Sequence, residues 1–233
     1  MSPSPAARPR PFVWHTIDVR PMLPRGWEEE IDVVARQHAV RHELIPGSVT
    51  SREDETVEAV PVMTLGGEVV FKALPWLHTL YHSRFRRLAS AVFGEPVDTA
   101  EDIRYGIYLN VQQGTEMRYE AHVDSAPISG LLYASTHAPG SGGELVIANH
   151  GDVKGVDEIE RDCSRVYPVA GYFVLFDARF NSHYVAPLRD PDSRRIAAAM
   201  SFYTTTSRET DRPADLTPHL GLDHPTDTKE YRV

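Results

Sequence analysis

Residues 119–124 have the sequence YEAHVD and lie where a β-rich run in the middle of the chain ends. In an extended strand alternate side chains share a face, so His122 and Asp124 point the same way while Val123 points back into the packing. An imidazole and a carboxylate side by side can occupy two adjacent positions around a metal ion. One more histidine from a neighbouring strand would complete the two-histidine, one-carboxylate face that leaves positions open on iron(II).

The chain around this stretch, from Pro96 onward, is a series of short runs rich in Ile, Val, Tyr and Phe, separated by Gly, Pro, Asn and Asp. Runs of this length and spacing predict a β-sandwich or barrel of the jelly-roll kind, mainly β with flanking helices. The expected strands are residues 103–112, 117–124, 128–135, 143–149, 164–169, 171–177, 182–188 and 195–205.

The sequence before Pro96 has helical periodicity in two places. Residues 26–40 carry apolar side chains at helical spacing behind an acidic start, which suits a helix N-terminus. Residues 75–93 repeat apolar side chains at steps of three and four, opened by a proline and closed at Gly94. We therefore expect two helices here.

Three further segments complete the N-terminal half. Residues 12–19 predict a short strand, and residues 62–72 predict a hairpin that turns at Gly66-Gly67. Residues 46–61 are polar and acidic and predict a loop, which is a candidate lid over a site although a plain surface connection is the commoner role.

A length of 233 residues suits one domain with a sizeable core, so we expect a single domain over residues 1–233. Its expected parts are a loose tail at 1–11, helical support at 12–100, a β core at 101–206 and a C-terminal tail at 207–233.

Charge and composition restrict the partners. The net charge of −9 argues against broad attraction to nucleic acid or to anionic membranes, and a basic cluster at 84–87 is most simply the solvated face of a helix. No apolar run approaches the ~20 residues that span a bilayer, and the N-terminus lacks the apolar core of a signal peptide. The single Cys163 excludes an internal disulfide and fits a reducing compartment, so the cytoplasm is the expected location.

The His-x-Asp motif is weak evidence when it stands alone. With 11 histidines in the chain about one such motif is expected by chance. Two occur, His122-Val-Asp124 and His150-Gly-Asp152, and the second lies just past an expected strand in a sequence that fits a turn.

Two histidine pairs at i,i+4 are further candidates for a metal site. His38 with His42, and His78 with His82, could each sit on one face of a helix and hold zinc. Neither pair has a nearby third ligand in the sequence, and exposed helix histidines are common, so a solvated surface role is favoured.

The order of residues downstream singles out His122 and Asp124. Residues 171–188 contain an apolar strand, a polar turn and then His183 at the start of another strand. Arg194 and Arg195 follow and open the apolar run 196–203, where a guanidinium could bind a carboxylate in bidentate fashion. Each residue alone could be structural, but their joint order is much less expected by accident.

These stretches together resemble the iron(II)/2-oxoglutarate-dependent oxygenases, in the style of the prolyl-hydroxylase-like branch. The resemblance rests on three stretches, RYGIYLNVQQGTEMRYEAHVD (104–124), GLLYASTHAPGSGGELVIANHGD (130–152) and GYFVLFDARFNSHYVAPLRDPDSRRIAAAMSFY (171–203). The shared features are a tyrosine three residues before the first ligand, a Gly-Gly before a strand, and His-x-Val-x-Pro with a downstream arginine. The resemblance implies a double-stranded β-helix with N-terminal helices packed on it, and iron(II) held by His122, Asp124 and His183.

The resemblance also implies a site for 2-oxoglutarate, with dioxygen as the second co-substrate. Arg195 matches the residue that pairs with the far carboxylate of 2-oxoglutarate, and Arg194 is the alternative because residues 190–193 blur the register. Tyr133 matches a tyrosine that often assists at the same carboxylate. The related branch often has a tyrosine where Gln112 stands, which is a departure from the pattern.

The retained Asp124 bears on the reaction. Related halogenases have glycine or alanine at this ligand position, so the resemblance implies hydroxylation, desaturation or ring closure of an unactivated C–H bond and not halogenation. The region also loosely resembles small enzymes that act on free amino acids in natural-product pathways, which suggests a small-molecule substrate. The candidate substrate residues are Tyr119, which we favour, then Arg118, Glu120 and Ser125, and beyond them Asp177, Arg179 and Asn181.

Three other functions stay open from the sequence. A peptide or protein hydroxylase would need an open groove, with the acidic loop 50–59 as a docking edge. A cupin-like metal protein would not use 2-oxoglutarate. A non-catalytic metal-binding domain would have no need of the carboxylate-binding arginine.

Overall fold

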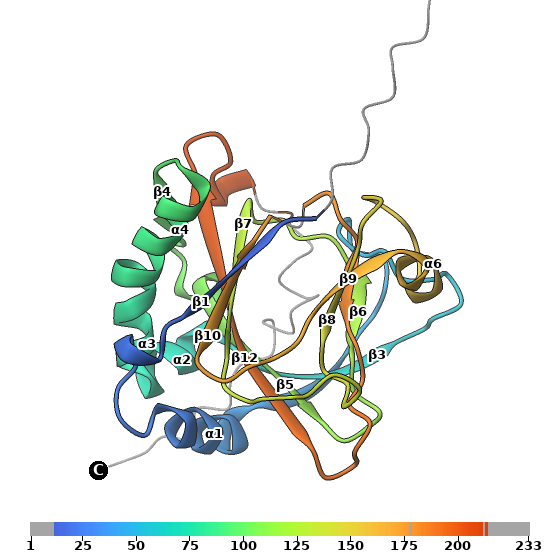
Figure 1. Ribbon diagram of the computed structural model, residues 1–233, viewed down its shortest axis with the longest axis horizontal. Coiled ribbons are helices and arrows are strands. Elements are labelled where there is room, and N and C mark those ends of the chain that lie inside the picture. The colour runs from blue at the N-terminus through green and yellow to red at the C-terminus, as the bar shows by residue number, and fades with distance from the viewer. Residues whose placement is uncertain (1–11, 178, 212, 214–233) are drawn as a thin grey trace, which may run out of the picture.

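The computed structural model describes residues 12–177, 179–211 and 213, and two antiparallel sheets dominate it (Figure 1). The expected tail at 1–11 and most of the expected C-terminal tail lie outside the described residues. The molecule is mainly β with some helices.

The larger sheet has eight strands in the order β1-β10-β7-β12-β5-β3-β2, with β4 paired to β12. Their bounds are β1 Trp14–Asp18, β2 Val40–Leu44, β3 Val60–Leu65, β4 Val97–Thr99, β5 Ile107–Gln113, β7 Ile128–Tyr133, β10 Tyr172–Phe176 and β12 Arg194–Thr204.

The smaller sheet has four strands in the order β6-β11-β8-β9. Their bounds are β6 Tyr119–His122, β8 Leu145–Ala148, β9 Cys163–Val166 and β11 His183–Val185, with the short helix α6 Val156–Arg161 before β9. Each of the eight runs expected to be strands contains one, which confirms that part of the prediction.

Two apolar layers hold the sheets in place. One cluster lies between the larger sheet and the helices, and it includes the stacked rings of Phe85 and Phe173, whose centroids are 4.5 Å apart. A second cluster lies between the two sheets and joins Leu131 and Phe176 to Leu145 and Val185. Strands β7, β10 and β12 of the larger sheet are therefore buried on both faces, which is why their sequences are mostly apolar.

The helices cover the outer face of the larger sheet (Figure 1). They are α1 Trp27–His38, α2 Gly67–Ala73, α3 Pro75–Leu80, a π-helical turn Tyr81–Phe85 and α4 Arg86–Phe93, and α5 Ile103–Gly106 leads into β5. The helix expected at 75–93 is present, with the π turn in its middle, and ends at Gly94 with φ 71°.

The prediction of a hairpin at residues 62–72 is wrong. β3 ends at Leu65 and helix α2 begins at Gly67, where a Cβ atom would lie only 1.9 Å from the carbonyl oxygen of Ile103. Gly67 thus lets a helix pack tightly against the backbone, and the chain does not turn into a hairpin here. The region 12–100 also supplies β1 to β4 to the larger sheet, in addition to helices.

Within the described part of the chain, none of the helices combines the length and apolarity needed to cross a bilayer.

Gly142 allows the loop before β8 to approach Pro187 closely, which makes a stability prediction. Its φ is +82°, and a Cβ atom would lie 2.1 Å from the Pro187 carbonyl oxygen. Gly140 has φ +90° but no atom near its Cβ position. Alanine is strained by the positive φ at both positions, but only at position 142 does its Cβ atom also meet another atom. Gly142→Ala should therefore destabilise the protein by about 1–3 kcal/mol more than Gly140→Ala in denaturant unfolding. Equal losses would contradict this packing.

Candidate active site

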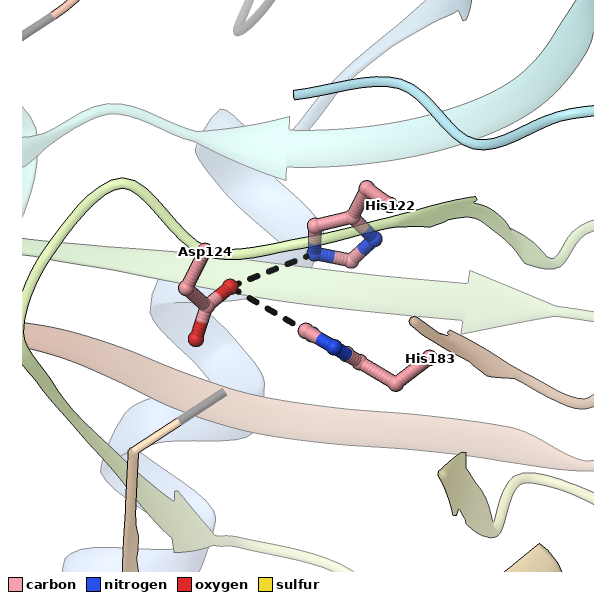
Figure 2. Close-up of side chains that lie close together, drawn as sticks. All are labelled: His122, Asp124 and His183. Carbon is pink, nitrogen blue, oxygen red and sulfur yellow. Dashed lines mark ion pairs between the residues drawn. The ribbon is translucent and has the colours of Figure 1, made fainter. Parts of the chain in front are cut away.

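Three potential metal ligands meet at the edge where β6 and β11 pair. His122 ends β6, Asp124 lies two residues beyond it, and His183 begins β11 directly opposite His122. Nε2 of His122 and Nε2 of His183 lie 3.4 Å and 3.3 Å from Oδ1 of Asp124 (Figure 2). One ligand atom from each residue falls within 4.8 Å of the others, a spacing that suits a single metal ion.

Backbone carbonyl groups fix the orientation of both imidazole rings. Nδ1 of His122 lies 2.9 Å from the carbonyl oxygen of Glu120, and Nδ1 of His183 lies 3.0 Å from that of Asn181. Because a carbonyl oxygen only accepts, Nδ1 must carry the proton and donate it. Nε2 of each ring is then the nitrogen that faces Asp124, and it is the atom through which a metal ion would be bound.

The carboxylate of Asp124 is fixed as well. The hydroxyl group of Ser129 in β7 donates to Oδ2 of Asp124, which leaves Oδ1 facing the two histidines. Burial opposes ionisation of Asp124, but His183 and His122 outweigh it and lower the pKa of this carboxyl group. Burial likewise opposes the charge on His183, and Asp124 outweighs it and raises the pKa of that imidazole.

The other histidine candidates have different surroundings. His150 pairs with Asp162 and Asp152 pairs with Arg52, so the second His-x-Asp motif is divided between two ion pairs. His38 ends α1 whereas His42 lies in β2, so these two do not share a helix face. Among the described residues, His122, Asp124 and His183 form the one group of three such ligands.

The pair His78 and His82 does share a helix face, with the two Nε2 atoms 2.9 Å apart. Nδ1 of His82 also lies 2.6 Å from the hydroxyl oxygen of Thr99. These contacts account for both rings without a metal.

Arg195 lies on the same cavity as the metal ligands. This cavity of about 50 Å3 between the sheets is lined by all three ligands and by Arg195, which is 2% exposed and lies over the ring of Tyr133. Nε of Arg195, the hydroxyl group of Tyr133 and Oδ1 of Asn110 are buried without a hydrogen-bond partner in the described chain. A buried guanidinium without an anion costs several kcal/mol, so this end of the cavity fits a carboxylate ligand.

Arg194 points to the other side of β12. Its Nη1 donates to Oδ1 of Asp32 in α1 at 3.0 Å, as expected for a neighbour in a strand. Of the two candidate arginines, Arg195 is therefore the one that the structure brings to the metal ligands.

The Gly-Gly motif packs against the stem of Arg195. A Cβ atom at Gly143 would lie 3.0 Å from Cδ of Arg195 and 3.1 Å from a side-chain carbon of Leu188. Larger residues would displace the arginine, so the glycines before β8 are explained by this close approach.

Strand β5 lines the cavity with residues that the sequence analysis did not assign. Tyr108 and Asn110 face the space between the metal ligands and Arg195. Gln112, two residues on, donates from Nε2 to the carbonyl oxygens of Met117 and Ala186, so it joins loops rather than facing a ligand. The alternation of polar residues at 108, 110 and 112 was the signal available in the sequence.

A second cavity of about 50 Å3, which we call the mouth, is also lined by His122 and Asp124 and includes Tyr119 and Ser125. A bulge in β6 places Tyr119 on the same side as His122, because His183 pairs with His122 while Val185 pairs with Tyr119. The rings of Tyr119 and His122 are 5.1 Å apart. Burial raises the pKa of Tyr119, so its hydroxyl group keeps its proton at neutral pH.

The other candidate substrate residues do not line either cavity. Arg118 donates to Glu53, and Glu120 accepts a hydrogen bond from Ser51. Asp177 and Arg179 form an ion pair with each other. Asn181 donates to the carbonyl oxygen of Ala148.

Solved structures share this arrangement of sheets and helices. One is an oxidoreductase of the 2OG-Fe(II) oxygenase family from Burkholderia pseudomallei, with TM-score 0.57 and 13% identity over 82% of this chain and 84% of that one. The chain has the fold of the 2OG-Fe(II) oxygenases. No family model and no curated protein sequence matches it.

Two further structures with this oxygenase fold come from nogalamycin biosynthesis. The carbocyclase SnoK has TM-score 0.58 and 14% identity, covering 94% of this chain and 89% of its own. The epimerase SnoN was solved with Fe3+, α-ketoglutarate and a nogalamycin compound. It has TM-score 0.56 and 17% identity, and the match covers 95% of this chain and 89% of SnoN.

The contact between Ser129 and Asp124 makes a prediction about metal binding. Ser129→Ala should weaken binding of Co(II) or Fe(II) about tenfold in anaerobic titration, because Oδ2 of Asp124 loses the donor that aims Oδ1. Ser125→Ala is the matched control, since Ser125 lines the same mouth and should leave affinity unchanged. Equal affinities for the two variants would show that Ser129 does not orient the ligand.

Proposed function

We propose that this chain is an iron(II)- and 2-oxoglutarate-dependent oxygenase that oxidises an unactivated C–H bond of a small molecule. The observation that carries the proposal is the shared cavity, with His122, Asp124 and His183 at one end and the buried Arg195 at the other. Nε of this arginine is buried without a hydrogen-bond partner among the described residues, which a metal site alone would not require.

We infer that strands β5 to β12 form the double-stranded β-helix that the family resemblance implies. The support is their pairing, β10-β7-β12-β5 in the larger sheet and β6-β11-β8-β9 in the smaller one. Along the chain these strands alternate between the sheets, apart from the consecutive pair β8 and β9. The ligands then lie at the mouth between the two sheets.

The residues present fit the two groups that the oxygenase fold implies. His122, Asp124 and His183 would hold iron(II) through two neutral imidazoles and a carboxylate. Arg195 would bind the far carboxylate of 2-oxoglutarate, with the hydroxyl group of Tyr133 beside it. When bound, iron with 2-oxoglutarate and dioxygen supplies the oxidising power and releases succinate and carbon dioxide.

The chain's own contribution is binding and exclusion. The apolar side chains between the sheets keep water from the buried end of the cavity, which strengthens the attraction between Arg195 and an anion. The hydroxyl groups of Tyr108 and Tyr119 beside the ligands would orient the substrate. Burial raises the pKa of both groups, so they act as donors at neutral pH.

The substrate class that the sequence suggests is a free amino acid or a derivative in a natural-product pathway. Two of the structures with the same fold are named for nogalamycin biosynthesis, which supports a natural-product substrate. No lysine or arginine is among the described residues lining the mouth, so an amino acid carboxylate would have to bind to hydroxyl groups such as those of Tyr119 and Ser125.

The placement of Arg195 predicts how 2-oxoglutarate turnover responds to mutation. Arg195→Met should lower the affinity for 2-oxoglutarate at least a hundredfold, measured by succinate formation and by anaerobic titration of the iron-loaded protein. Arg194→Met, the neighbouring control, should change it less than threefold because Arg194 pairs with Asp32. A loss confined to Arg194→Met would contradict the assignment, and no dependence on 2-oxoglutarate would favour a cupin-like metal protein.

The retained Asp124 predicts the class of product. Succinate formation screened over free amino acids, natural-product intermediates and peptides in chloride buffer should give hydroxylated, desaturated or cyclised products of a small molecule. No chlorinated product is expected, because the carboxylate occupies the ligand position that halogenases leave open. Chlorinated product from the wild-type enzyme would overturn this prediction, and turnover confined to peptides would favour a protein hydroxylase.

A further inference from the structure

Residues 48–54, which we call the strap, run alongside the strand that carries His122. The backbone nitrogen of Arg52 donates to the carbonyl oxygen of Ala121 at 2.7 Å, and that of Val123 donates to the carbonyl oxygen of Thr50 at 2.9 Å. Ser51 forms an isolated antiparallel bridge with His122. The strap therefore adds a short strand-like segment to the outer edge of β6, and the segment expected to be a loop or lid is fixed to the site.

Glu53 adds a charged anchor to these backbone contacts. Its side chain is only 1% exposed, and Oε2 accepts hydrogen bonds from the backbone nitrogen of Ala121 at 2.9 Å and from Nη1 of Arg118 at 2.7 Å. Charge-assisted hydrogen bonds of this kind are stronger than neutral ones. One buried carboxylate thus joins the strap to β6 on the residue directly before His122.

The strap is also anchored to the loop that contains the second His-x-Asp motif. The guanidinium group of Arg52 pairs with Asp152, with one contact of 3.2 Å from Nη2 to Oδ2. The backbone nitrogen of Gly155 donates to the carbonyl oxygen of Arg52 at 2.7 Å. Asp152 therefore has a structural role, since its ion pair with Arg52 joins the strap to this loop.

The strap also reaches the mouth of the cavity. Thr50 lines the mouth together with Tyr119 and His122, and the hydroxyl group of Ser51 donates to Glu120 at 3.3 Å. One short segment therefore contacts both the ligand-bearing strand and the space where a substrate would bind.

Strand β6 is short and irregular, so contacts from the strap would stabilise it. It comprises only Tyr119–His122 and contains a bulge opposite β11, and without the strap it would be an edge of the smaller sheet. Bulged strands are bent and lose ladder hydrogen bonds, and edge strands are supported on one side only.

We propose that Glu53 is a positioning residue, which through Ala121 and Arg118 fixes β6 so that Nε2 of His122 stays aimed at the shared metal position. The proposal rests on the proposed function for the identity of the metal site, and it adds a determinant of metal affinity that lies outside the ligands. Glu53 touches neither the ligands' donor atoms nor the cavity.

Cobalt(II) titration of the metal-free, full-length protein tests this role through affinity and the visible spectrum, which reports coordination geometry. Glu53→Ala should weaken binding at least tenfold and alter the spectrum, and Glu53→Gln should fall between this variant and the wild type because its amide oxygen can still accept from Ala121. The matched control is Glu55→Ala, since Glu55 lies two residues on, with a side chain 89% exposed, and should match the wild type.

Titrations are made at a temperature where circular dichroism shows every variant folded, so that loss of structure is not read as loss of affinity. If Glu53→Ala does not fold, Glu53→Gln and Arg118→Met carry the test. Wild-type affinity and spectrum in the Glu53 variants would overturn the positioning role. If the His183→Ala variant binds cobalt(II) as tightly as the wild type does, the proposed metal site itself is overturned.

Discussion

The site depends on one pair of opposed residues, His122 in β6 and His183 in β11. Antiparallel pairing places their rings 4.2 Å apart between centroids, and Asp124, just beyond the end of β6, brings a carboxylate to both. A shift of either strand by one residue would turn its histidine to the other face. The bulge in β6, the hydrogen bonds of both Nδ1 atoms to carbonyl oxygens and the hydroxyl group of Ser129 all serve to keep this register and aim.

The second constraint is electrostatic. Burying Arg195 between the sheets lowers the pKa of its guanidinium because desolvation disfavours the charge. Tyr133 and Glu144 offset only part of this cost, so a bound anion would stabilise the charged side chain further. Tyr133 contributes its ring face, and Gly143 leaves room for the aliphatic stem. One cavity joins this cation to the metal ligands, so a ligand with an anionic group could meet Arg195 at one end and the metal at the other.

The sequence predicted the strands and the long helix because their apolar periodicity is local and strong. It predicted the hairpin at 62–72 wrongly, since a Gly-Gly pair can equally allow a helix to pack closely against Ile103. The choice between Arg194 and Arg195 stayed open because it depends on the register of β12 against β5, a long-range property. The anchoring of the strap by Glu53 could not be seen either, because residues 65 or more positions apart in the chain form it.

The central claim is that one cavity holds a metal at His122, Asp124 and His183 and the far carboxylate of 2-oxoglutarate at Arg195. A crystal structure of the protein grown anaerobically with manganese(II) and 2-oxoglutarate tests it most directly. The account predicts metal density at the three ligands and a carboxylate of 2-oxoglutarate on the guanidinium of Arg195. Metal bound elsewhere, or 2-oxoglutarate held by another cation while Arg195 stays unpaired, would contradict it.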